Sequence, residues 1–129
     1  MQDRKSLMIC ALVSFTIGAA VANSVKADSP APAYVISEIE VTNPEGYAKE
    51  YVPLATKALA QSGQQRLVSG GKALALSGAP PAGRIVVSKF ESLEQAQAAY
   101  SSPAYLEARK IGDRYGKLRI FAVEGLGTH

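Results

Sequence analysis

The sequence contains one cysteine, one histidine and no tryptophan among its 129 residues. A single cysteine cannot form a disulfide within the chain, and several His and Cys ligands cannot be gathered around a metal. Only 19% of the residues are charged whereas 47% are hydrophobic, which is the composition of a folded globular protein. The sequence therefore excludes a disulfide-stabilised mini-protein, a zinc-finger type of domain and a disordered chain. Its length suits one domain.

The excess of positive charge is small and lies mostly at the N-terminus. The whole chain has 14 basic and 11 acidic residues, a formal net charge of +3. Without residues 1–27, it has 11 basic and 10 acidic residues. Binding to nucleic acid needs clustered cationic side chains that neutralise phosphates. The nearly neutral remainder therefore argues against nucleic acid as a partner.

Residues 1–27 have the features of a secretory signal peptide. Arg4 and Lys5 provide the positively charged start, and an apolar run of 16 residues follows. This run is shorter than the roughly 18 to 20 apolar residues of a membrane-spanning helix, so we favour a cleaved signal over a membrane anchor. Cleavage after Ala27 or after Ala22 would leave small residues at the sites that signal peptidase reads. We therefore expect an exported protein, periplasmic or secreted, with no membrane contact after cleavage.

A short linker separates the signal peptide from the domain. Residues 28–33 read Asp-Ser-Pro-Ala-Pro-Ala, and the two prolines disfavour both helix and sheet pairing. We expect the folded domain to cover residues 34–126, followed by a C-terminal tail at residues 127–129. No internal repeat and no second linker divides the domain in the sequence.

The domain alternates between strand and helix patterns. The predicted elements are a strand at 34–42, a helix at 45–62, a strand at 65–77, a strand at 84–90, a helix after Ser92 that restarts after Pro103, and a strand at 117–124. Pro53 is expected to kink the first helix or to loosen the turn before it. The strand at 65–77 is expected to contain a bulge or bend at Gly70-Gly71, and a loop at 78–83 then closes a hairpin.

This order of elements predicts the ferredoxin-like βαββαβ fold of the α+β class. In this fold, both helices cover one face of a four-stranded antiparallel sheet. The other face is left bare, and Ile36, Ile85 and Val87 are expected to line it. A bare apolar face of this kind predicts a protein partner.

A series of short motifs extends from Ala33 to Leu126. They are Ala33-Tyr34-Val35-Ile36, Glu40-Val41-Thr42-Asn43-Pro44-Glu45, Arg66-Leu67-Val68-Ser69-Gly70-Gly71, Arg84-Ile85-Val86-Val87, Ser102-Pro103-Ala104-Tyr105 and Val123-Glu124-Gly125. In this order they resemble domain-of-unknown-function family 1330, which is part of the dimeric α/β-barrel superfamily. Two positions depart from the family pattern: Ser69 stands where a second arginine precedes the glycine pair, and Lys89 stands where a glutamate is usual.

The resemblance implies a homodimer in which two sheets face each other and enclose a shared barrel. Relatives in the superfamily include small cofactor-free monooxygenases, isomerases and haem enzymes, and also chains without a known activity. The fold alone does not choose among these functions.

Arg66 is the leading candidate for a ligand-binding residue. Its guanidinium lies beside the glycine pair, where it could bind a carboxylate or phenolate, or form an ion pair with a nearby glutamate. Tyr51 and Tyr105 are expected near it on the helices, although tyrosines at helical spacing more often serve packing. Glu38 and Lys89 are expected to share one sheet face, as a proton-transferring pair or as a salt bridge.

No catalytic cluster can be assembled from the sequence beyond residue 27, because its only histidine is the terminal His129 and it has no cysteine. A glycine motif that holds phosphates is also lacking, since no helix is expected directly after Gly70-Gly71. We therefore expect no metal and no cofactor.

Two hypotheses about function remain. The first is a non-catalytic exported homodimer that binds a small organic molecule or acts as an interaction module. The second is a cofactor-free enzyme, similar to a monooxygenase or isomerase, that acts on a small carbonyl or phenolic compound in the barrel. A closed, polar-lined cavity near Arg66 would favour the enzyme, whereas a filled apolar core would favour the interaction module.

Overall fold

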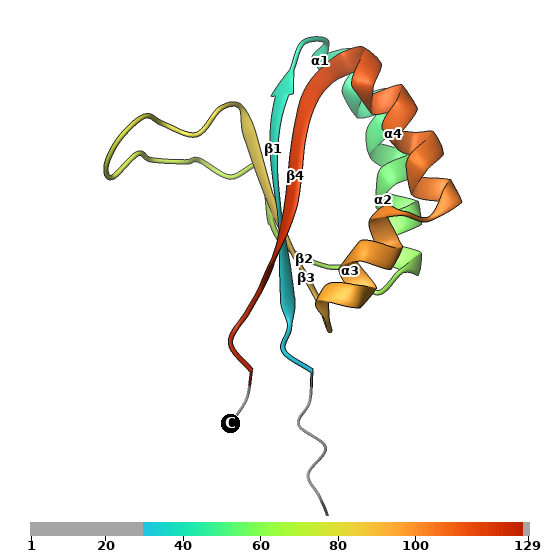
Figure 1. The fold of residues 1–129 in the computed structure, drawn as a ribbon. Coiled ribbons are helices and arrows are strands. Elements are labelled where there is room, and N and C mark those ends of the chain that lie inside the picture. The colour runs from blue at the N-terminus through green and yellow to red at the C-terminus, as the bar shows by residue number, and fades with distance from the viewer. Residues whose placement is uncertain (1–29, 128–129) are drawn as a thin grey trace, which may run out of the picture.

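The computed structural model describes residues 30–127, so the predicted signal peptide, the start of the linker and the last two residues of the tail lie outside it. The strands are β1 (Ala33–Val41), β2 (Gln65–Ser69), β3 (Arg84–Phe90) and β4 (Gly116–Glu124). They form one antiparallel sheet in the order β2-β3-β1-β4, and the helices cover one of its faces (Figure 1). The predicted ferredoxin-like βαββαβ order is confirmed.

The first crossover is helical along its whole length but changes its hydrogen-bond pattern twice. It consists of α1 (Pro44–Gly46), the π-helix η1 (Tyr47–Tyr51) and α2 (Val52–Gln61). The Asn43 side chain caps its start by accepting a hydrogen bond from the Gly46 N–H at 3.1 Å. The π-helical turn comes just before Pro53, which lacks the N–H that an α-helix uses at that position. The predicted loosening before Pro53 is confirmed, and within this turn Tyr47 and Tyr51 are both buried.

The second crossover consists of α3 (Leu93–Tyr100) and α4 (Pro103–Tyr115). The hydroxyls of Ser92 and Ser102 cap the two helices by accepting hydrogen bonds from the N–H groups of Gln95 and Tyr105. Together with the sheet, the helices enclose a core whose largest fully buried side chains include Phe90 and Val35. None of the helices within residues 30–127 is long and apolar enough to cross a membrane.

The structure corrects the prediction of one long strand at 65–77, because β2 ends at Ser69 and residues 70–83 form a loop (Figure 1). Gly70 has a φ of +71°, which turns the chain out of the sheet. The alternating residues that follow have no neighbouring strand with which to pair, and Leu74 and Leu76 are 77% and 91% exposed. A period of two thus indicates a strand only where a partner strand is within reach.

The sheet face opposite the helices carries an apolar row that crosses all four strands. Val68 lies opposite Val87, Val87 lies opposite Ile36, and Ile36 lies opposite Phe121. Val68 and Phe121 remain 39% and 37% exposed. Because residues alternate between faces along a strand, Ile85 shares this face with Val87. The predicted apolar lining of the bare face is therefore confirmed.

Candidate functional site

A bulge in β2 puts two polar side chains on the helix-covered face of the sheet. In a regular strand, residues three apart point to opposite faces. The register shift after Arg66 removes this alternation, so that Arg66 lies opposite Ser88 while Ser69 lies opposite Val86, both on the covered face. The sequence predicted a bulge or bend at the glycine pair. The structure has a bend at Gly70, whereas the bulge lies earlier, within β2.

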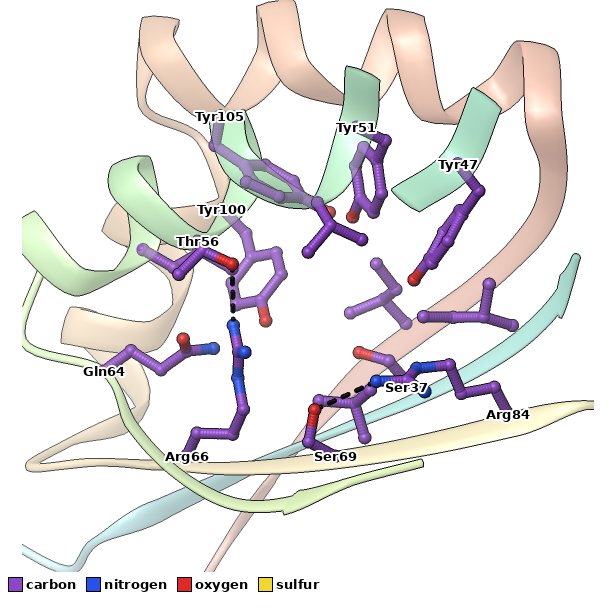
Figure 2. A pocket seen from close by; sticks show the side chains of 16 residues that line it. Ser37, Tyr47, Tyr51, Thr56, Gln64, Arg66, Ser69, Arg84, Tyr100 and Tyr105 are labelled. Atoms are coloured by element: carbon purple, nitrogen blue, oxygen red, sulfur yellow. Dashed lines mark hydrogen bonds between the residues drawn. The ribbon is translucent and has the colours of Figure 1, made fainter. Parts of the chain in front are cut away.

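A cavity of about 50 Å³ lies between this part of the sheet and the helices. Figure 2 shows the hydroxyls of Tyr47, Tyr51 and Tyr100 directed from the helices toward the sheet. The Arg84 guanidinium lies on the sheet side of the cavity, and that of Arg66 extends from the sheet to Thr56 of α2. The other polar residues that line it are Ser37, Thr56, Gln64, Ser69 and Tyr105. None of the described residues in the lining is acidic. We call this space the donor cavity.

Both arginines of the donor cavity keep hydrogen-bond donors free. Arg66 Nη2 donates to Thr56 Oγ1 at 3.2 Å, and Arg84 Nη2 donates to Ser69 Oγ at 3.0 Å. Within residues 30–127, neither guanidinium forms an ion pair. A guanidinium has five N–H donors, so most of the capacity of each one is available to an anion. Both residues are exposed, so the cavity reaches solvent beside them.

Burial keeps the tyrosines of the donor cavity protonated. It raises the pKa of the Tyr51 hydroxyl well above its usual range, raises the pKa of Tyr100 to about 12, and raises the pKa of Tyr47. At neutral pH these groups are therefore O–H donors. The buried hydroxyl of Tyr105 makes no hydrogen bond of normal geometry within the described chain, although the Tyr51 hydroxyl and the Arg109 guanidinium lie near it. An unpaired buried hydroxyl is unfavourable by about 1–3 kcal/mol, which a ligand atom would relieve.

The raised pKa of Tyr100 predicts a loss of stability at alkaline pH. Its pKa is 10.0 in the unfolded reference and about 12 in the fold, so the folded protein retains a proton that the unfolded chain releases. Tyr100 thus leaves the free energy of unfolding unchanged while the pH is below the pKa of the unfolded chain. Above that pH, the free energy of unfolding falls by up to about 1.4 kcal/mol per pH unit. Urea unfolding between about pH 8 and about pH 11 measures this fall. Tyr100→Phe should reduce the slope, and an equal slope in both proteins contradicts the prediction.

Three of the residues predicted from the sequence, Arg66, Tyr51 and Tyr105, line the donor cavity together. The sequence reasoning missed Arg84. The alternation along β3 puts Arg84 on the same face as Ser88, so the period of two was a signal that could have identified it.

The predicted Glu38–Lys89 pair does not form, although both residues lie on the uncovered sheet face. Glu38 lies opposite Ile85, whereas Lys89 lies opposite Tyr34. The Glu38 carboxylate instead accepts a hydrogen bond from Arg119 Nη1 at 2.8 Å. Neither residue lines the donor cavity.

Gly112 in α4 provides the space that the Tyr51 ring occupies. A Cβ atom on Gly112 would lie 2.6 Å from Cδ2 of Tyr51, which is only 6% exposed. Alanine normally stabilises a helix interior by roughly 0.5–1 kcal/mol relative to glycine. For Gly112→Ala we expect the reverse, a loss of about 1–3 kcal/mol, because Tyr51 must move within a packed core. Urea unfolding measures the change, and a gain in stability would be incompatible with this packing.

The family of domains of unknown function DUF1330 matches residues 32–126. The chain belongs to this family. The resemblance inferred from its short motifs is thereby confirmed. No curated protein shows a significant match to the sequence.

Solved structures similar to this DUF1330 domain confirm the fold class. The RPA0582 protein of unknown function from Rhodopseudomonas palustris matches with a TM-score of 0.58 and 17% identity, over 78% of this chain and 87% of that chain. SnoaB, a cofactor-independent oxygenase from Streptomyces nogalater, matches with a TM-score of 0.51 and 10% identity, over 76% of this chain and 96% of that chain. A conserved protein from Methanosarcina mazei Go1 matches with a TM-score of 0.50 and 11% identity, over 76% and 96% of the two chains. At such identities the likeness concerns the fold alone.

Proposed function

We propose that this DUF1330 domain binds a small organic anion, a carboxylate or phenolate, in the donor cavity. The observation that carries the proposal is the lining, in which Arg66 and Arg84 lie across from tyrosine hydroxyls with no acidic residue among the described side chains. Guanidinium and hydroxyl donors that converge without a counter-charge are complementary to an oxyanion. The cavity volume of about 50 Å³ suits a group of that size, since a water molecule takes about 30 Å³ of liquid.

Binding is favoured over catalysis because the donor cavity offers no base. A general base must accept a proton near neutral pH. The described lining has no His, Cys, Asp or Glu, and burial raises the pKa of its tyrosines Tyr47, Tyr51 and Tyr100. The cavity is polar but open beside Arg66, so it matches neither the closed cavity expected of an enzyme nor the filled core expected of an interaction module.

Calorimetric titration with acetate, benzoate and 4-nitrophenolate, all of which are ionised at mildly alkaline pH where the fold is still stable, tests the proposed function. We expect saturable binding of at least one of these anions, because a charged acceptor engages both guanidinium groups. The neutral amides acetamide and benzamide serve as matched controls of similar shape and should bind at least about tenfold more weakly. Binding of the amides as tightly as the acids, or no binding of the acids at millimolar concentration, overturns the proposal.

We also propose that the domain is a homodimer formed through the uncovered sheet face. The apolar row from Val68 to Phe121 supports this proposal, because exposed apolar rows across a sheet favour association. The loop between β2 and β3, which carries the exposed Leu74 and Leu76, leaves the sheet on the side away from the helices (Figure 1). A stable interface buries about 1,600 Å² in total, and a four-stranded face with an added loop can supply half of it.

We propose export of the protein with loss of residues 1–27. The support is the Arg4-Lys5 start and the apolar run, both in the part of the chain that lies outside the described residues. N-terminal sequencing of protein from the cell envelope or medium is expected to begin at Asp28, or at Asn23 if the earlier site is cleaved. Mature protein that still begins at Met1 would show that the segment is not removed.

A further inference from the structure

A second, larger cavity lies next to the donor cavity. It is an open groove with a volume of about 450 Å³ between α3, α4 and β4, and Leu93 and Leu106 on its walls are 41% and 48% exposed. Its apolar lining consists of Val35, Leu93, Ala96, Leu106, Ile120, Phe121 and Ala122. The volume falls within the range of about 300–1,000 Å³ that is typical of small-molecule sites. We call this space the apolar cavity.

The two cavities share three wall residues, Tyr100, Tyr105 and Ile120. The rings of Tyr100 and Tyr105 meet edge to face with their centroids 4.6 Å apart. The Tyr105 hydroxyl, which makes no hydrogen bond of normal geometry within the described chain, belongs to this shared wall. A molecule that occupies both cavities has to displace the half-buried Tyr100 ring from its edge contact with the buried Tyr105.

The cationic group at the apolar cavity is already engaged. Arg109 lines it, but its Nε donates to Asp113 Oδ1 at 2.8 Å and its Nη2 donates to the Leu118 carbonyl at 3.0 Å. The guanidinium groups of Arg66 and Arg84, by contrast, have no carboxylate partner among the described residues. An anionic group is therefore bound more favourably in the donor cavity, while the apolar cavity suits a hydrocarbon group.

We propose that the ligand is an amphipathic monocarboxylate, with its carboxylate on Arg66 and Arg84 and its apolar chain or ring extending past Tyr100 and Tyr105 into the apolar cavity. This inference rests on the proposed function and adds the class of ligand. The donor cavity, at about 50 Å³, holds the anionic group alone, whereas the adjoining 450 Å³ accommodates the rest of a larger molecule. The Tyr105 hydroxyl can then donate to a carboxylate oxygen, which satisfies its unpaired donor.

A chain-length series tests the inference. The protein is titrated with acetate, butyrate, hexanoate and octanoate, and with 3-phenylpropionate as the aromatic alternative. Burial of each methylene should tighten binding by about fourfold until the apolar cavity is filled. An affinity that rises along the alkanoate series identifies an alkyl ligand. An affinity that rises only for 3-phenylpropionate identifies an aryl ligand. Either result supports the proposal.

Two variants test whether the increase in affinity for larger acids comes from the apolar cavity. Ala122 and Gln97 are exposed residues that line the apolar cavity but not the donor cavity, so Ala122→Phe and Gln97→Phe fill it without a change in the core. Both should bind acetate as the unmodified protein does and lose the gain with longer or aromatic acids. Ala122→Ser is the matched control and should retain the gain. Thermal melts of each variant verify that it is folded.

The outcomes separate the two proposals. Acetate binding with no gain for any larger acid, or an equal gain in the protein and both filled variants, overturns the amphipathic ligand and leaves the proposed function standing. Failure of the carboxylates and of the phenolate to bind overturns the proposed function itself.

Discussion

Replacing Val87 by aspartate is expected to convert the proposed homodimer into monomers. Val87 lies between Val68 and Ile36 in the apolar row, so a second sheet packed on this face would bury the new carboxylate. Burial of an unpaired polar or charged group is unfavourable by several kcal/mol, which corresponds to at least about a thousandfold weaker association. Analytical ultracentrifugation at micromolar concentration measures the change.

The matched control is Leu54→Asp, which introduces the same charge at a leucine of α2 that is 46% exposed. This variant should remain dimeric because the helices lie on the other face of the sheet (Figure 1). A protein that is already monomeric at micromolar concentration, or a Val87→Asp variant that stays dimeric, contradicts an interface on this face.

Removal of both arginines from the donor cavity is expected to eliminate anion binding while the fold persists. Each charge-assisted hydrogen bond contributes about 1.5–3 kcal/mol, so Arg66→Ala combined with Arg84→Ala should weaken binding by at least about a hundredfold. The melting temperature should change little, because both residues are exposed and their hydrogen bonds are to neutral hydroxyls. Calorimetric titration beside a thermal melt measures the two effects.

Arg114→Ala is the matched control for charge, because Arg114 is an exposed residue of α4 outside the lining of the donor cavity. It should leave anion affinity within about twofold, since exposed charges are largely screened by salt. A double variant that loses stability but retains its affinity would identify Arg66 and Arg84 as structural residues and remove them from the site.

Local patterns in the sequence were sufficient to predict most elements of this fold. The alternation of β1 predicted that Ile36 lies on the uncovered face, and Val35 and Ile39 are buried on the other face because successive side chains of any strand point to opposite sides. The helix predicted after Ser92 begins there, since a capping side chain satisfies N–H groups only two or three residues away. Pro53 predicted the altered turn because it lacks an N–H.

The tertiary structure alone decided which residues line the donor cavity and which residues lie opposite each other in the sheet. Glu38 lies opposite Ile85 rather than Lys89 because the register of β1 against β3 depends on the whole ladder. The strand predicted through Ser77 ended at Ser69 because pairing needs a neighbour that the sequence pattern does not reveal. The register shift in β2 then set Arg66 and Ser69 on one face, where packing of the helices brought the tyrosines over them. Periodicity within a segment is a local property, whereas register, bulges and cavities arise from contacts between segments far apart in the chain.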